Sequence, residues 1–560
     1  MIVINSNNFD YNLEKYGEKI IGIVLTGKIK IDILSKILKD FNIVNNEEDL
    51  KSIEKRNLVN SKVLSKSFIE NNDHINSFDV LIFDLIDNQD FYFHIIFKIL
   101  NLRAVKKEGR IPEIIVINHS DTLENIPLNT DKVLENKIRK NEIKVNYSNS
   151  PYRIRERWEM LTEIYEKVIK TKLEEGIILV VTPGVRESEF LIRKIKNAKR
   201  EDLESYLLDE NIHKTKFGRF NTKNKTTVLV TDANNLLPLP YENIEIIYDC
   251  YMRSNFNGDS ISYSSRERSE MLNNYIFKEG EINIMTSEEF YNKSPIFLPP
   301  FIPYHDLYRY YILIVRSAKY RPEILFNSLV SETKIKEIGQ TLKDLNIVDR
   351  KRIVGTNQYT EGKILIDENI LFSIPLSFRP AFIIYKVIKS YSNLPLFPFI
   401  VLASIIDITK GNFYSVEDPL IFYLNTWLNF TKEFKDLEVE RNEIQDWCKL
   451  NGLDYRIFNA LLEKVREVYD ALSKKYDIEI GLFNVENLMK KSIKFLEKVY
   501  KEYVFHRKDK INNIYTNKQE EVKLVKPEKF KYPDQVISFY QNRNNKKGEM
   551  NQIVFYTILN

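Results

Sequence analysis

The stretch GIILVVTPGVRESEFLIRKI, residues 176–195, joins an apolar run, a turn and a helical pattern. A continuous Val/Ile/Leu run bounded by polar turns is typical of a strand that is buried on both faces of a parallel sheet. Further runs of this kind follow along the chain: TTVLVTDA, IEIIYDCY and EINIMTS. We therefore expect an α/β domain over residues 151–300.

Similar runs occur before this stretch, between residues 15 and 150. They are KIIGIVLTG, FDVLIFDLID and PEIIVIN, and helical patterns separate them. They predict a first α/β domain within residues 1–150, so that two domains with parallel sheets follow each other along the chain.

The character of the sequence changes at about residue 300, where the prolines of FLPPFIPYHD mark a break. The next part is mostly helical. Within SETKIKEIGQTLKDLNIVD, apolar residues recur on one helical face: Ile335, Ile338, Leu342 and Leu345. After about residue 490 the runs shorten to NIYTN, EVKLVK and QVISFYQ, which predict a terminal β module.

Length and composition predict a globular protein with several domains. A chain of 560 residues is too long for one core, and 43% hydrophobic with 29% charged residues allows well-formed cores. The net charge is only +4, from 83 Lys+Arg against 79 Asp+Glu. This balance gives no chain-wide attraction to nucleic acid or to an anionic membrane, so any basic surface must be local.

The cysteine count and the N-terminus bear on the compartment. Cys250 and Cys448 are too few for a disulfide framework or a zinc knuckle. The N-terminus lacks a basic start followed by an apolar core, and the most apolar stretch, LPLFPFIVLASIID, is shorter than a membrane span. We expect a cytoplasmic protein, or a virion component if the source is viral, without a membrane partner.

Several segments resemble DEAH/RHA-type helicases, which are superfamily 2 DExH RNA helicases. Residues 176–195 resemble the strand, turn and helix that open their second RecA-like domain, and residues 226–249 resemble the segment that carries motif V. The stretch from Ser262 to Phe290 is similar to motif VI and the strand after it. Further segments keep the family's order as far as the C-terminus: 370–388, 402–430, 447–472 and 525–541.

The resemblance implies five modules. These are a degenerate, shortened RecA-like domain at 1–150, a second RecA-like domain at 151–300, a winged helix at 301–372, a helical bundle (ratchet-like) at 373–490 and an OB-fold at 491–560. The fold class expected is thus α/β, with additional α and small β modules.

A helicase of this family hydrolyses ATP with a glycine-rich loop, a lysine on the phosphates and a hydroxyl on Mg²⁺. The best match to this loop is IVLTGKIKID, in which Thr26, Gly27 and Lys30 fall into place. Ile29 replaces the glycine before the lysine, and Ile31 replaces the Mg²⁺-binding threonine. A β-branched residue obstructs the close backbone approach that glycine allows.

The other catalytic motifs are altered as well. The DEAH box is matched by DLID, with Asp84 and Asp87 at its ends and Leu85 in place of the glutamate that polarises water. The arginine-rich motif VI aligns with residues 268–275, and none of its arginines or glycines is in place. Its positions include Arg268, Ser269, Leu272 and Tyr275.

We therefore expect an inactive, helicase-like protein that serves as an RNA-binding or scaffolding subunit of a larger assembly, with a viral assembly as one setting. No catalytic residue, metal or cofactor is expected; ATP and Mg²⁺ enter only if the chain is active. RNA binding would be weak and independent of sequence. By resemblance, Arg186 and Thr231 lie where the family contacts the RNA backbone.

Other interpretations stay open. The chain could be a divergent but active ATP-dependent RNA helicase, or a protein-interaction module that binds no RNA. Lys30 could equally be a surface lysine after a strand, and Asp84 and Asp87 could simply close a buried strand. The aromatic and basic stretch at 304–321 is more often a core stripe with a solvated face than a stacking surface.

Overall fold

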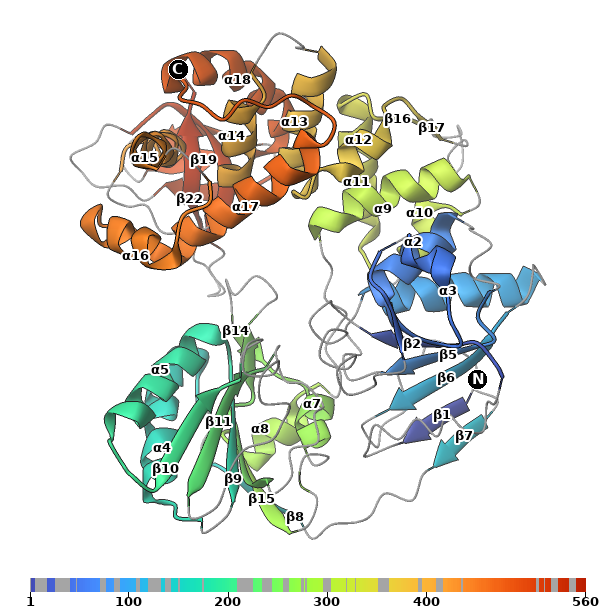
Figure 1. Ribbon diagram of the computed structural model, residues 1–560, viewed down its shortest axis with the longest axis vertical. Helices are drawn as coiled ribbons and strands as arrows, with labels where there is room; N and C mark the ends of the chain where they lie inside the picture. Colours follow the sequence, from blue (N-terminus) through green and yellow to red (C-terminus); the bar gives the residue numbers. More distant parts are fainter. Residues whose placement is uncertain are drawn as a thin grey trace. The chain divides into compact units, whose positions relative to one another are not determined.

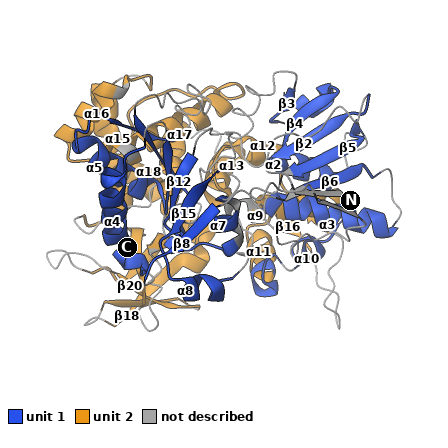
Figure 2. Cartoon of the chain, turned by 90° about the horizontal axis from the view of Figure 1, so that it is seen from below, with its two compact units in different colours: residues 1–303, 319–335 blue, residues 304–318, 336–560 orange. Residues whose placement is uncertain are grey.

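The structure is a computed structural model, and it divides into two compact units (Figure 2). One comprises residues 1–303 and 319–335, and the other comprises residues 304–318 and 336–560. The structure describes residues 2–5, 18–25, 41–46, 48–70, 77–84, 91–106, 111–118, 132–135, 143–149, 152–173, 176–208, 225–233, 244–254, 261–272, 276, 279–295, 304–318, 320–327, 329–350, 362–390, 395–408, 416–434, 437–509, 513–517, 519–524, 532–542 and 550–559.

The first unit contains a seven-stranded sheet in the order β3-β4-β2-β5-β6-β1-β7 (Figure 1). All its neighbouring strands are parallel. The strands are β1 (Ile2–Asn5), β2 (Ile21–Leu25), β3 (Asn42–Val44), β4 (Arg56–Asn60), β5 (Val80–Asp84), β6 (Glu113–Asn118) and β7 (Lys132–Glu135). The three buried runs predicted here are confirmed as β2, β5 and β6.

Among the described residues, two α-helices accompany this sheet, α2 (Ser61–Glu70) and α3 (Phe91–Lys106). Phe83 of β5 contacts Phe93 and Phe97 of α3, with ring centres 5.6 and 4.7 Å apart. The first pair meets edge to face and the second is tilted, so aromatic side chains fix α3 against the middle of the sheet.

The same unit contains a six-stranded sheet, in the order β10-β11-β9-β12-β15-β8. Its neighbouring strands are again all parallel. The strands are β8 (Ile143–Tyr147), β9 (Ile177–Thr182), β10 (Leu203–Leu207), β11 (Thr226–Asp232), β12 (Ile244–Asp249) and β15 (Gly280–Ile284). The four runs predicted from sequence are confirmed as β9, β11, β12 and β15.

The strand β8 precedes residue 151, where the sequence analysis starts the second domain. It nevertheless pairs with β15, from Ile143 opposite Gly280 to Tyr147 opposite Ile284. Residues that precede the expected domain boundary at residue 151 therefore contribute a strand to the second sheet. Val145 on this edge strand is 41% exposed, which explains why β8 carries no continuous apolar run.

Helices cover both faces of the second sheet (Figure 1). On one face, α4 (Arg157–Lys170) and α5 (Val185–Asn197) bury residues such as Leu161, Ile164 and Leu191 against the strands. On the other, α7 (Arg266–Met271) and α8 (Glu288–Lys293) pack with the core that includes Leu272 and Tyr291. A hairpin of β13 (Met252–Ser254) and β14 (Ile261–Tyr263) lies between β12 and α7 in the chain.

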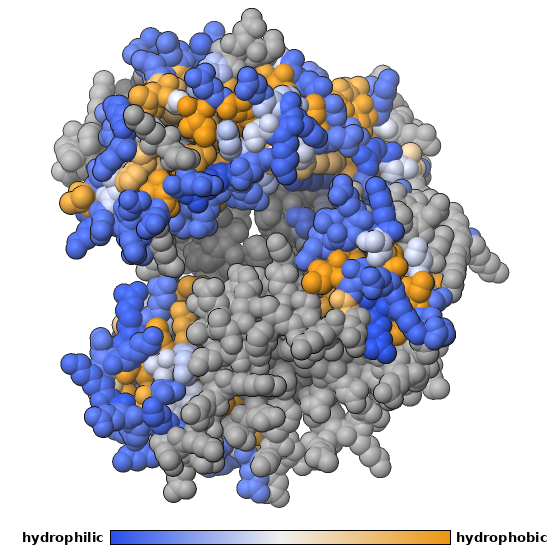
Figure 3. All heavy atoms as spheres, in the orientation of Figure 1, coloured by the Kyte–Doolittle hydropathy of each residue, from blue (hydrophilic) through white to orange (hydrophobic). Residues whose placement is uncertain are grey.

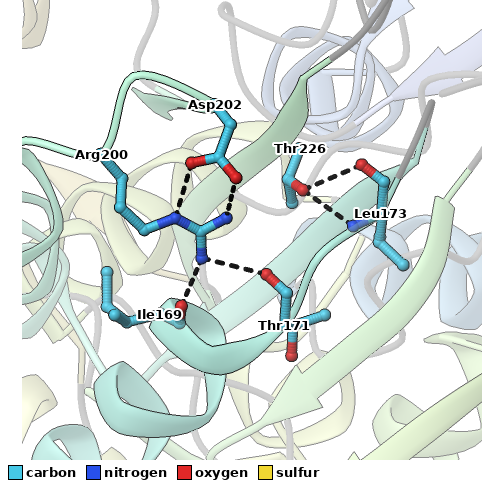
Figure 4. A network of polar contacts seen from close by, with 6 residues as sticks. All are labelled: Ile169, Thr171, Leu173, Arg200, Asp202 and Thr226. Carbon is cyan, nitrogen blue, oxygen red and sulfur yellow. Dashed lines mark hydrogen bonds and ion pairs between the residues drawn. The ribbon is translucent and has the colours of Figure 1, made fainter.

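A polar cluster fastens the C-terminal end of α4 (Figure 4). The Arg200 guanidinium forms a two-pronged pair with Asp202, at 2.8 and 2.6 Å, and donates to the carbonyl oxygens of Ile169 and Thr171. These carbonyls end the helix and would otherwise lack an intrahelical partner. Beside them, the Thr226 hydroxyl of β11 donates to the Leu173 carbonyl at 3.1 Å.

The remaining helices lie in the second half of the chain. They are α9 (Tyr304–Ser317), α10 (Pro322–Leu325), α11 (Glu332–Asp344), α12 (Glu368–Ser373), α13 (Phe378–Ser390), α14 (Phe397–Ile408), α15 (Pro419–Glu433), α16 (Arg441–Leu450), α17 (Tyr455–Ser473) and α18 (Val485–Val499). The helix predicted around residue 340 is confirmed as α11; Ile335, Ile338 and Leu342 within it and Leu345, the residue after its end, are all buried. The strands β16 (Val348–Asp349) and β17 (Lys363–Ile364) pair antiparallel.

The chain ends in a closed barrel of strand order β18-β19-β20-β22-β21. Its strands are β18 (Val504–Asp509), β19 (Ile514–Thr516), β20 (Glu521–Leu524), β21 (Gln535–Asn542) and β22 (Asn551–Ile558). Phe505, Tyr515 and Val536 are among the residues that fill its core. The terminal β module predicted from short runs is thereby confirmed.

Asp418 connects this barrel to α15. Its carboxylate accepts hydrogen bonds from the Thr557 hydroxyl at 2.7 Å, the Ile558 amide at 2.8 Å and the Ile421 amide at 3.1 Å. The last of these is the N-cap bond of α15.

Within the described part of the chain, no helix is both long and apolar enough to cross a membrane. The same residues contain no group of three or more His, Cys, Asp or Glu side chains placed to hold a metal ion.

Candidate functional site

The nucleotide-pocket candidates of the first sheet follow two adjacent strands. Val24 of β2 pairs with Phe83 of β5, so the strands end together at Leu25 and Asp84. Ligands of open α/β sheets bind beyond such carboxyl ends. Thr26, Gly27, Lys30 and Asp87 lie outside the described residues, as does the Asp84 side chain, so their roles stay predictions.

The strand order adds a second candidate position, which the sequence analysis missed. The strands β6 and β1 are neighbours in the sheet, and their connections run in opposite directions along the strand order. The connection after β1 returns to β2, whereas the connection after β6 continues to β7 at the edge. The same reversal occurs between β2 and β5. Because ligands bind where connections reverse, a phosphate loop could follow either β1 or β2. The short run IVIN of β1 gave no strand signal at the start of the chain.

Neither position carries the phosphate-loop signature. A Gly-Lys pair occurs only at Gly27-Lys28 and Gly362-Lys363, and isoleucine follows both. The segment after β1, residues 6–16, contains no glycine. The pattern Gly-Lys-Ser/Thr is therefore absent from all 560 residues, whichever strand is assigned to the loop.

The described part of the motif VI segment, residues 268–272, lies in the short helix α7 and its C-cap residue Leu272. The Ser269 hydroxyl donates to the buried Asp249 carboxylate at 2.7 Å, and the Tyr251 amide donates to the same carboxylate at 2.8 Å. Burial raises the pKa of Asp249, while these two hydrogen bonds oppose the rise. Ser269 is thus a structural partner of β12.

Leu272 lies at another motif VI position that aligns with an arginine. It is 1% exposed and belongs to the core on the α7 side of the second sheet, together with Ile276 and Ile282. Arg268 is half-buried, and Tyr275 is outside the described residues. Two of the positions aligned with arginines therefore hold side chains that face the interior.

The carboxyl edge of the second sheet holds the two nucleic-acid candidates. Arg186 lies in the first turn of α5, is exposed, and has no ion pair with a described residue. Thr231, near the end of β11, is fully buried, and its hydroxyl donates to the Asp232 carbonyl at 3.3 Å. The structure therefore leaves only Arg186 accessible to a ligand, and the role of each stays a prediction.

Buried hydroxyls hold this edge together. The Thr182 hydroxyl is 2.6 Å from that of Ser188 and 3.2 Å from the carbonyl oxygens of Gly184 and Thr231. These bonds join the ends of β9 and β11 to the first turn of α5. They fix the turn from which Arg186 projects.

An ion pair joins the N-terminal turns of α4 and α5. The Arg157 guanidinium lies 2.8 Å from the Glu187 carboxylate, and Glu187 is only 4% exposed. Trp158, next to Arg157, contacts Phe190 of α5, with ring centres 5.0 Å apart. These aromatic residues carry no recognisable site motif in the sequence, although the run RERWEM places a tryptophan among charges.

Two parallel α/β sheets, a helical region and a terminal barrel define a DExH helicase-like fold. The structure matches two crystal structures of Escherichia coli HrpB, one described as a DEAH/RHA helicase and one as a DExH-box NTPase, with TM-scores of 0.67 and 0.62. Each match covers 100% of this chain at 10% sequence identity, and 68% and 66% of the HrpB chains. This chain thus spans about two thirds of their length.

Comparisons of the whole sequence do not reveal this similarity. No protein-family model matches the sequence, and no curated protein matches it. The predicted resemblance to DEAH/RHA helicases is therefore confirmed for the fold.

Proposed function

We propose that this protein is a catalytically inactive, DEAH-helicase-like protein that serves as an RNA-binding or scaffolding subunit of a larger assembly. The observation that carries the proposal is the absence of Gly-Lys-Ser/Thr from the whole sequence. In helicases this pattern supplies the amides, the ammonium and the hydroxyl that hold the nucleotide phosphates and Mg²⁺. No ATP or Mg²⁺ requirement follows for this chain.

Two further losses support the proposal. Leu85 stands where a DEAH box has its glutamate, and loss of a general base typically costs about 10²–10⁴ in rate. Ser269 and Leu272 stand at arginine positions, and an arginine finger is worth about 10³–10⁵ in related phosphoryl transfer. Because both side chains are buried and engaged, the change at these positions is built into the fold.

The rest of the fold supports a binding role. The antiparallel pair β16–β17 among short helices fits a winged helix. A closed barrel of five strands fits an OB-fold, a fold that binds oligonucleotides in other proteins. Arg186 is an exposed cation at the edge where helicases hold the RNA backbone. Binding to the phosphates of RNA does not require ATP hydrolysis and does not depend on the base sequence.

The proposal is tested by ATP hydrolysis with and without single-stranded RNA, with E. coli HrpB as the positive control. We expect no RNA-stimulated turnover above background. A turnover near 1 s⁻¹, at the low end of ordinary enzyme rates, that disappears in Lys30→Ala would contradict the proposal and favour a divergent active helicase.

A further inference from the structure

An aromatic and cationic cluster, here called the α4–α5 cluster, joins the outer sides of these two helices. It consists of Arg157, Trp158 and Tyr165 of α4 and Phe190 and Lys194 of α5. The Arg157 guanidinium lies 4.9 Å from the Trp158 ring centre, and Trp158 and Phe190 meet edge to face at 5.0 Å. The Lys194 ammonium lies 5.1 Å from the Phe190 ring centre and 5.4 Å from that of Tyr165.

Trp158 differs from the other two tryptophans of the chain in its exposure. It is 36% exposed, whereas Trp427 is 0% and Trp447 is 4% exposed. The core face of α4 is formed by other residues, among them Met160 and Leu161. A large ring that the core does not use is available for an outside partner.

Charge around Trp158 favours a partner that carries phosphates. Three carboxylates close to it are engaged: Glu187 with Arg157 at 2.8 Å, Glu189 with Arg193 at 3.3 Å, and Glu156 with Arg155 at 3.5 Å. Glu159, the next residue of α4, is an exposed carboxylate, and the cations Arg186 and Lys194 outnumber it. Arg186, one helical turn before Phe190, has no such partner among the described residues. Over α4 and α5 the surface is mostly hydrophilic, with small hydrophobic patches (Figure 3).

We propose that Trp158 is a stacking platform for a base of single-stranded RNA whose backbone contacts Arg186. The inference builds on the RNA-binding part of the proposed function and is independent of ATP hydrolysis. Exposed aromatic rings beside cations are the general means of holding a single strand, since every base has a face to stack. One turn of helix, about 5.4 Å, separates the phosphate contact from the aromatic pair.

The native protein carries its own reporter. Stacking on Trp158 quenches its fluorescence, while buried Trp427 and Trp447 do not contact the ligand. Titration with an unstructured oligoribonucleotide should quench part of the emission, with free tryptophan amide correcting for light absorbed by RNA. Inorganic polyphosphate, which has charge but no bases, should not quench. Equal quenching by both ligands would indicate a conformational response and would overturn the stacking role.

Variants separate this inference from the proposed function. By anisotropy of labelled RNA, Trp158→Ala should weaken binding about tenfold, whereas Trp158→Phe keeps most of the affinity and loses the quenching. Leu450→Ala, which removes an 85% exposed side chain elsewhere, is the control and should bind normally. RNA binding that persists unchanged in Trp158→Ala refutes the stacking platform alone. No RNA binding by the native protein refutes the RNA-binding proposal itself.

Discussion

In the alignment predicted from sequence, Leu272 stands at an arginine position of helicase motif VI. An arginine finger must reach out of its domain to a nucleotide, whereas Leu272 is 1% exposed and packs under the second sheet. Ser269, three residues before it, is used to satisfy the buried Asp249 carboxylate. A buried carboxylate that loses one of its hydrogen bonds is less stable, so the serine contributes to the stability of the fold.

Putting arginine back at this position should therefore damage the fold without restoring activity. Leu272→Ala removes a buried side chain and should cost about 2–5 kcal/mol of unfolding free energy. Leu272→Arg should cost at least as much, because it buries a charge without a partner. Urea denaturation followed by circular dichroism measures both, with Leu450→Ala, which truncates an 85% exposed side chain, as a control that changes little. A stable Leu272→Arg variant with new ATPase activity would show that the position still faces a nucleotide.

Arg186 permits a test of the backbone contact. Arg186→Glu replaces an exposed cation with an anion, so binding of single-stranded RNA should weaken several-fold with no change in base preference. Arg193→Glu on the same helix is the matched control, since Arg193 is already paired with Glu189 at 3.3 Å. Anisotropy titrations of uridine-rich and adenosine-rich oligomers measure both effects. Equal weakening by the two variants would mean that only overall charge matters.

At the level of secondary structure, sequence predicted what is buried on both faces. The runs that became β2, β5, β6, β9, β11, β12 and β15 are rich in apolar residues, and every residue of β2, β9 and β11 is buried. Strands such as β8 and β10, which form the edges of the second sheet, are partly exposed and lack this signal. The strand β1 was missed because four residues are too few for a pattern.

The candidate site was harder to predict than the strands, for a physical reason. Loops that bind phosphate are recognised by glycines and lysines at fixed spacing, and the pattern Gly-Lys-Ser/Thr does not occur in this sequence. The strand order, which sequence does not reveal, shows two positions where such a loop could lie. The Trp158–Phe190 contact depends on how α4 and α5 pack, and neither helix pattern reveals it alone.

Arg200 provides a prediction about the stability of the second sheet. Its planar guanidinium group binds the Asp202 carboxylate and two backbone carbonyls at the end of α4. A lysine ammonium cannot reproduce this geometry. Arg200→Ala should lower the melting temperature by about 2–4 °C for each kcal/mol lost, and Arg200→Lys should lower it less. Differential scanning calorimetry of the native protein and the two variants measures the order of their melting temperatures. Equal melting of Arg200→Lys and the native protein would show that charge alone suffices.

The pairing of Arg200 with Asp202 should also make the free energy of unfolding depend on pH. Hydrogen bonding to Arg200 lowers the pKa of Asp202 below its ordinary value. Its contribution is therefore present above the ordinary aspartate pKa, about 3.9, and is lost as the pH falls through the lowered value. Arg200→Ala should differ from the native protein at pH 6 and approach it near pH 2. A constant difference across this range would assign the effect of Arg200 to its carbonyl bonds.

For the whole molecule, near-balanced charge limits how RNA can be held. A net charge of +4 over 560 residues gives little long-range attraction, so affinity must come from local cations such as Arg186. Contacts of this kind act by releasing counterions from phosphates. A plot of log affinity against log salt concentration should therefore have a slope of about −0.7 for each phosphate neutralised. Because few cations contribute, we expect the total slope to be small.

Titration of labelled single-stranded RNA at several salt concentrations measures this gradient for the native protein. We expect weak, sequence-independent binding that falls steadily as salt rises, and a gradient shallower by about 0.7 in Arg186→Glu, which loses one phosphate contact. Trp158→Ala should weaken binding while leaving the gradient unchanged, since stacking releases no counterions. If no RNA binds even at low salt, the helicase-like fold serves protein partners instead, and the exposed face of α4 and α5 becomes the first surface to test against them.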